Sequence, residues 1–283
     1  IITPRQLSDR IASGDMPTDT PAGKLIGRKT PTAKPGLQAG DYLTLMLREH
    51  SDHVILTSDG TPETAYVGLL SRRDLTRTEG AAPLAIVEDM ANAPNVTTLA
   101  KLRSQAERVL AAGLTGTDSL RWLGPMATAF NAAVLQRIVA LVEQALADEA
   151  IPIPDLQHCW VFFGSAGRGE LLTRHDLDHG LVYQEPPDAQ ARPARAYFLE
   201  LGRRVSAGLG ACGFLTTAKG IVAGHPSACR SMDEWRRAFS TWVRDPVGSS
   251  VYRATSLFDL HPVCGDCRLV DRLVQHIHAE EDE

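Results

Sequence analysis

The sequence lacks the features that mark several large classes of protein. Cysteine is scarce, with five residues in 283, and this odd, thinly spread number does not form the disulfide framework of a small secreted domain. Lysine and arginine total 29 against 34 aspartates and glutamates, which gives a net charge of −5. Nucleic-acid binding depends on clustered cations, so we do not expect nucleic acid to be the main partner. Hydrophobic residues, at 43%, suffice for packed cores.

Long hydrophobic runs are also missing. No uninterrupted apolar run reaches the ~20 residues that a bilayer span needs. The nearest candidate, residues 132–147, contains polar and charged residues at positions 136, 137, 143 and 144. The sequence begins with isoleucine and shows no signal peptide. We therefore expect a cytoplasmic protein with reduced thiols and no membrane partner, and we interpret the sequence as an internal piece of a longer chain.

The order of local patterns predicts an α+β (mixed α/β) fold. Residues 41–48 are predicted to form a helix, and residues 53–57 and 65–70 two strands. Residues 84–148 are helical almost throughout, because apolar side chains recur three or four apart, and the prolines at 152 and 154 end this segment. Residues 194–209 again have helical spacing.

A glycine-rich turn follows a buried strand at residues 159–163. The turn reads Gly-Ser-Ala-Gly-Arg-Gly over residues 164–169. A strand that ends in Gly164-Ser165 and turns into a helix exposes backbone N–H groups, which favour an anion. The Ser165 hydroxyl and the planar guanidinium of Arg168 are further donors for a phosphate, and the glycines leave it room. The pattern is not a P-loop, since no Gly-Lys-Ser/Thr follows.

Two aspartates open the next apolar strand, residues 177–183. Because side chains alternate along a strand, Asp176 and Asp178 point to one face, with Cα atoms roughly 6–7 Å apart. Two carboxylates on one face suit Mg²⁺, which proteins hold with one or two carboxylates together with substrate phosphates. By itself such a pair is more often a turn or a solvated edge. Next to a phosphate-binding turn it indicates phosphoryl or nucleotidyl transfer.

These two motifs together resemble the nucleotidyltransferase superfamily that includes protein-PII uridylyltransferase. More closely, residues 118–283 resemble a family of bacterial nucleotidyltransferase-like proteins with CBS and often cyclic-nucleotide-binding domains. The resemblance continues in residues 209–213, in Trp235 and Trp242, which we expect to pack in the core, and in residues 257–266. Proteins of this family usually extend further, so we expect that this chain is cut at its C-terminus.

The resemblance assigns roles to individual residues. It implies that Gly164 and Ser165 bind the nucleotide phosphates and that Asp176 and Asp178 hold the metal. A third carboxylate on a later strand positions the acceptor hydroxyl or acts as base, and Asp259 is the candidate; the alternative is an ordinary strand-end turn residue. The family commonly has Thr-Asp-Gln-Asp-Asn where this chain has His-Asp-Leu-Asp-His at 175–179, which leaves open whether this copy is active. We expect both of these histidines to be solvated loop residues; the alternative is contact with the metal or a phosphate.

The first 80 residues resemble a pair of CBS units whose first unit is incomplete. Residues 68–74, Gly-Leu-Leu-Ser-Arg-Arg-Asp, match the motif in which Ser71 and Asp74 hold the ribose and phosphate of an adenine nucleotide. In the first unit, Gln6 stands where the ribose-binding aspartate is expected. The alternative for Ser71 and Asp74 is a helix cap with a solvated carboxylate. A CBS pair would sense adenylate and could mediate a homodimer.

The combined interpretation is a regulated, Mg²⁺-dependent nucleotidyltransferase. We expect a CBS pair at 1–80, a helical connector at 81–150, a transferase core at 151–190 and a helical substrate-binding region at 191–283. The enzyme would transfer a nucleoside monophosphate from an NTP, most concretely a uridylyl group, to a PII-like signalling protein. Two alternatives stay open: a non-catalytic nucleotide sensor, and nucleotidyl transfer to a small molecule.

Overall fold

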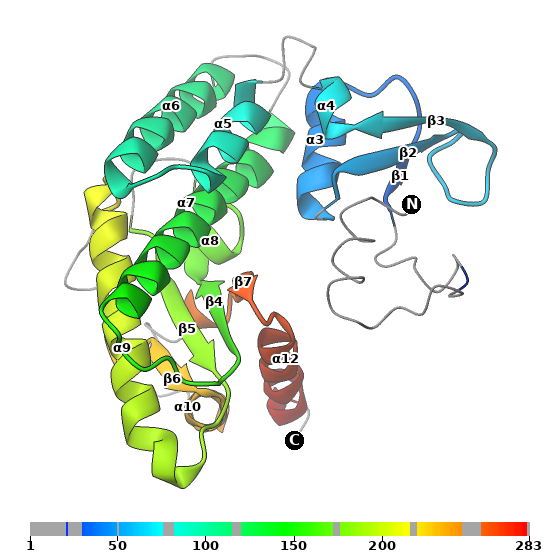
Figure 1. Cartoon of the computed structure of the whole chain (residues 1–283). Helices are drawn as coiled ribbons and strands as arrows, with labels where there is room; N and C mark the ends of the chain where they lie inside the picture. Colours follow the sequence, from blue (N-terminus) through cyan, green and yellow to red (C-terminus); the bar gives the residue numbers. More distant parts are fainter. Residues whose placement is uncertain are drawn as a thin grey trace. The chain divides into compact units, whose positions relative to one another are not determined.

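The chain forms two compact units, Ile1–Ala81 and Ala82–Glu283, in the computed structural model shown in Figure 1. The structure describes residues 21, 30–49, 51–75, 82–114, 120–171, 176–215, 220–244 and 256–281. Gln6 and the first strand of the predicted CBS pair lie outside these residues, as does His175.

The described part of the first unit is a three-stranded sheet with two helices. β1 (Thr32–Ala33) runs parallel to β2 (His53–Thr57), and β3 (Tyr66–Ser71) pairs antiparallel on the other side of β2. A parallel pair needs a crossover connection, which α3 (Ala39–Arg48) provides between β1 and β2. α4 (Arg72–Leu75) follows β3 directly. The helix and the two strands predicted between residues 41 and 70 are confirmed.

The second unit begins with a group of helices. The segment predicted to be helical forms α5 (Ala82–Ala91), α6 (Val96–Leu114) and α7 (Leu120–Asp148). α7 lies against α5, α6 and the later helix α9 (Asp188–Ala211) and is the central helix of the group (Figure 1).

α7 carries the most apolar stretch of the chain. Residues Trp122–Asp148 are long and apolar enough, with a mean hydropathy of 1.4, to resemble a membrane-spanning helix by length and composition. Within the fold, however, Phe130, Val134 and Ile138 are fully buried against the neighbouring helices. A core helix has the same composition, because both environments select apolar side chains.

A four-stranded mixed sheet forms the rest of the second unit. Its order is β6-β5-β4-β7, and the central strand β4 (His158–Phe162) pairs antiparallel with both β5 (His179–Tyr183) and β7 (His261–Gly265). β6 (Cys229–Ser231) runs parallel to β5. The predicted α+β fold class is confirmed.

The sheet joins the two segments, 151–190 and 191–283, that are expected from the sequence to be a transferase core and a helical substrate-binding region. Two of its strands come from each segment, and residues 82–283 form a single compact unit. The difference has a physical reason: sequence periodicity reports which residues are buried in a strand, but not which distant strand lies beside it.

The two faces of the sheet are covered by different helices. On one face, Cys159, Val161 and Phe163 pack with residues of α10 (Met232–Arg244) and α12 (Arg268–Glu281). Trp235 of α10 is fully buried there, as predicted.

The other face of the sheet lies against α9. The ring of Tyr183 on β5 stacks on Phe198 of α9, with ring centroids 4.4 Å apart. Gln136 of α7 also reaches the sheet, donating from Nε2 to the carbonyl of Val263 on the edge strand β7, 2.9 Å away.

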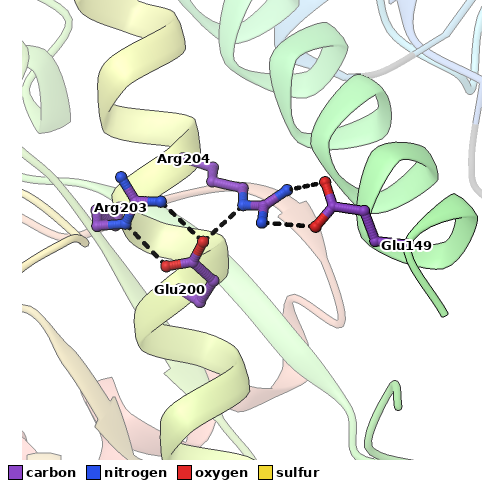
Figure 2. A network of polar contacts seen from close by, with 4 residues as sticks. All are labelled: Glu149, Glu200, Arg203 and Arg204. Carbon is purple, nitrogen blue, oxygen red and sulfur yellow. Dashed lines mark hydrogen bonds and ion pairs between the residues drawn. The ribbon is translucent and has the colours of Figure 1, made fainter. Parts of the chain in front are cut away.

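An ion-pair network fixes α9 against the end of α7, as Figure 2 shows. Arg204 donates to both carboxylate oxygens of Glu149, at 2.6 and 2.8 Å, and to Glu200 at 2.6 Å. Arg203 makes two further hydrogen bonds to Glu200, both 2.8 Å. The hydrogen bonds from Arg203 and Arg204 lower the pKa of Glu200 to about 2, so the carboxylate stays ionised at neutral pH.

Candidate active site

The glycine-rich turn forms a single helical turn at the end of β4. Phe163 is extended, and α8 (Gly164–Gly167) follows it, beginning with Gly164 at a positive φ of 56°. Glycine tolerates this left-handed conformation, whereas other residues rarely adopt it. The first backbone hydrogen bond of the turn runs from the Gly167 N–H to the Phe163 carbonyl, at 3.1 Å. The N–H groups that precede it have no acceptor within the helical turn, which is the general property that suits them to an anion.

Asp178 lies directly beside this turn. The Phe163 N–H donates to the Asp178 carbonyl at 3.0 Å, which aligns the residue before β5 with the residue before α8. A Cβ atom added at Gly164 would lie 3.6 Å from Oδ2 of Asp178. The Asp178 carboxylate therefore faces the start of the predicted phosphate-binding turn.

Burial alternates along residues 176–179, as the period of a strand predicts. Leu177 and His179 are buried, whereas Asp176 and Asp178 are half-buried. Burial raises the pKa of Asp178. The Ile221 N–H donates to Oδ1 at 2.9 Å, and this hydrogen bond lowers the pKa. The nearby negative charge of Asp176 raises the pKa further.

This donor set fits a Mg²⁺ ion. Asp176 and Asp178 offer hard oxygen ligands, and a cation would offset the burial and mutual repulsion that disfavour the charged form of Asp178. Within the described ranges, no group of three or more His, Cys, Asp or Glu side chains is placed to hold a metal ion. The protein ligands would then number two, with substrate phosphates completing the coordination.

Asp259 lies beside α8, in a bend two residues before β7. Its backbone carbonyl packs against Gly167 so closely that a Cβ atom there would overlap it. The sequence predicts that Gly167 leaves room for a phosphate. In the structure it leaves room for the backbone of Asp259.

The Asp259 carboxylate forms an ion pair with Arg168, which also bonds Glu170 at 2.9 Å. Glu170 and then Asp259 raise the pKa of Arg168. The structure therefore pairs the candidate third carboxylate with the arginine predicted to bind phosphate. The side chains of Arg168 and Asp259 are 46% and 30% exposed, so the ion pair is accessible to a competing ligand.

Strand pairing places the predicted residues around the turn. Phe162 is opposite His179 on one side and opposite His261 on the other. Asp178 thus lies beside Gly164 at the start of α8, and Asp259 lies against Gly167 at its end. The predicted residues of the second unit thus gather at one end of the sheet.

Ser256 is a site residue that was not predicted from the sequence. Its Oγ would be 3.6 Å from a Cβ atom at Gly164, which puts this half-buried hydroxyl next to the turn. It lies more than 90 positions along the chain from the turn, and no local pattern marks it.

His179 differs from its prediction as a solvated loop histidine. It is fully buried at the start of β5, where Nδ1 lies 2.7 Å from the Leu177 carbonyl and Nε2 lies 3.0 Å from Ser206 Oγ on α9. Burial lowers its pKa to about 4. The prediction is wrong because the polar sequence around His179 gives no sign that its side chain faces α9 and is buried there.

Ser71 and Asp74 in the first unit form a reciprocal helix cap. The Asp74 carboxylate accepts from the N–H of Ser71 at 2.9 Å and from its hydroxyl at 2.5 Å, and the Asp74 N–H lies 3.2 Å from Ser71 Oγ. This is the arrangement that the cap interpretation predicts. Asp74 is exposed, so its carboxylate is accessible to a ligand.

Comparison with known proteins relates the second unit to one family. The model of a family described as putative nucleotidyltransferase DUF294 matches residues 104–249. The match includes the α8 turn, Asp176 and Asp178, and it ends before Asp259. A search of the curated proteins finds no match to the chain. Because the family model covers just over half of the chain, the protein belongs to this family of putative nucleotidyltransferases.

Proposed function

We propose that the second unit transfers a nucleoside monophosphate from an NTP, with Mg²⁺, to a hydroxyl group of an acceptor. The observation that carries the proposal is the position of the Asp178 carboxylate beside Gly164, at the start of the turn that follows a buried strand. A metal bound by the aspartates and phosphates bound by the turn would then be neighbours.

In this proposal each residue has one role. The N–H groups at the start of α8 and the Ser165 hydroxyl bind the phosphates. Asp176 and Asp178 would hold Mg²⁺, which would neutralise phosphate charge. The acceptor oxygen forms a bond to the α-phosphorus, the bond from that phosphorus to the β-phosphate oxygen breaks, and pyrophosphate leaves.

The Arg168–Asp259 ion pair suggests how the last two residues take part. A nucleotide phosphate competes for the guanidinium of Arg168, because arginine binds phosphate with the same planar donors as carboxylate. Asp259 is then released to accept the proton of the acceptor hydroxyl.

The most concrete acceptor is a PII-like signalling protein, with UTP as the donor. This finer assignment rests on the resemblance of the glycine turn and the aspartate pair to the superfamily of protein-PII uridylyltransferase. We further propose that the first unit is a CBS module that binds an adenine nucleotide through Ser71 and Asp74, mediates a homodimer and regulates the transferase in the cytoplasm. Its βαββα element order supports this.

A second candidate function is non-catalytic nucleotide sensing. It is favoured by the Arg168–Asp259 ion pair, which engages the third carboxylate, and by the two-carboxylate donor set among the described residues. A sensor would bind NTP with Mg²⁺ in the same place but transfer nothing.

Transfer of label from α-labelled NTPs to cell extract separates these functions. We expect Mg²⁺-dependent labelling of one protein band, with UTP as the best donor, and its loss in Asp178→Asn. The amide of this variant retains an oxygen that accepts from the Ile221 N–H, which makes the substitution a conservative one. Label in a small molecule would show that the acceptor is a small molecule and not a protein. NTP binding without any labelling would favour the non-catalytic sensor.

A further inference from the structure

A polar cavity lies away from the aspartate pair. It has a volume of about 520 Å³ and is bounded by α9, the loop before β6, β6 and α10. Three arginines line it, Arg195, Arg230 and Arg237, together with one carboxylate, Glu234. Its volume is in the range of small-molecule sites, and it is open to solvent over most of its extent.

Arg230 is the most constrained of the three arginines. It is half-buried on β6, and its Cζ atom lies 5.1 Å from the centroid of the Trp235 ring and 5.7 Å from that of Trp242. No hydrogen-bond acceptor for its guanidinium is found among the residues that the structure describes. Two indole rings therefore orient a half-buried cation whose N–H donors are available to a ligand.

The other charged groups leave the cavity positive. Arg195 forms an ion pair with Glu234, whose second oxygen accepts from the Ser231 N–H at 3.1 Å. Arg237, which also lines the cavity, donates from Nε to the Asp233 carbonyl at 3.2 Å. Three guanidinium groups against one carboxylate give an excess of two positive charges, although the chain as a whole carries −5.

The geometry points to a second ligand site, which binds a small phosphorylated molecule other than the NTP of the candidate active site. Several guanidinium groups around one cavity match a phosphate dianion, because each can form paired hydrogen bonds to its oxygens. Because two indole rings already orient the Arg230 side chain, it loses less conformational entropy when it binds a ligand.

The site is separate from the aspartate pair and lies at the β6 edge of the sheet. Arg230 is paired with Val182, four residues after Asp178 along β5. Strand spacings then put the Cα atoms of Arg230 and Asp178 roughly 14 Å apart. A ligand here would not share its phosphate contacts with an NTP at α8.

Calorimetric titration of the full chain with inorganic pyrophosphate, in EDTA, tests this inference. EDTA removes the divalent metal that the other site needs. We expect saturable binding that weakens with added salt and that weakens at least about tenfold in Arg230→Lys, which keeps the charge but loses the paired donors. Arg237→Ala should also weaken binding and leaves the buried core unchanged.

Two control variants separate the sites. Arg108→Ala removes one positive charge from the exposed surface of α6, and Asp178→Asn alters the aspartate pair; both should bind pyrophosphate as the wild type does. Absence of saturable binding at millimolar pyrophosphate, equal weakening in Arg108→Ala and Arg230→Lys, or loss of binding in Asp178→Asn would overturn the inference. Tighter binding of succinate than of pyrophosphate would overturn its assignment to phosphate.

Discussion

The backbone carbonyl oxygen of Asp259 lies so close to the α-carbon of Gly167 that a Cβ atom at position 167 would overlap it. This contact joins the glycine turn after β4 to the segment before β7, more than 90 residues later in the chain. The position of Asp259 at the candidate site therefore depends on a missing side chain in the turn.

Substitution of Gly167 by alanine should move the Asp259 segment. We expect Gly167→Ala to destabilise the second unit by about 1–3 kcal/mol, because backbone must shift to accommodate the methyl group. Thermal melting measures the effect. Gly68→Ala is the control, since its Cβ would meet only a Leu56 methyl at 3.9 Å. Equal melting of Gly167→Ala and the wild type would contradict the packing described.

The ion-pair network between α7 and α9 predicts a pH dependence. The pKa of Glu200 falls from 4.5 to about 2 on folding, so its stabilisation is complete above about pH 4.5 and is lost as the pH falls toward 2. Glu200→Gln should therefore be less stable than the wild type at pH 7, by about 1 kcal/mol for a partly exposed network. Denaturant melts at several pH values measure this difference, which should shrink below pH 4.5. A difference independent of pH would show that the charge of Glu200 contributes nothing.

The first unit offers a matched pair of variants for adenylate binding. Asp74 and Asp41 both cap a helix from its third position, Asp74 with Ser71 and Asp41 with the Gln38 N–H. Loss of either cap should cost about 1 kcal/mol. Asp74→Ala should in addition abolish the thermal shift caused by AMP, whereas Asp41→Ala should keep it. If AMP still raises the melting temperature of Asp74→Ala, Ser71 and Asp74 form a helix cap and do not bind the nucleotide.

Local features of the second unit could be predicted from the sequence. The buried strand before Gly164 and the alternating burial of residues 176–179 follow from residue order and from the two-residue period of a strand. The helical spacing of residues 130–145 similarly predicts most of α7. In each case the information lies within a few neighbouring residues.

Features that depend on distant segments could not be predicted in this way. Ser256 reaches Gly164, and Arg168 pairs with Asp259, only because β7 lies beside β4. The burial of His179 depends on α9 covering one face of β5. The arginine cavity likewise requires α9, β6 and α10 to meet, and no sequence motif joins its three arginines.

Thermal melting with NTPs, with and without Mg²⁺, tests the central claim most directly. A ligand at 100 times its Kd adds about 2.7 kcal/mol of stability, which raises Tm by several degrees in a domain of this size. We predict an NTP shift that requires Mg²⁺ and is lost in Asp176→Asn. A Mg²⁺-dependent NTP shift of unchanged size in Asp176→Asn would contradict the metal site and the catalytic account built on it.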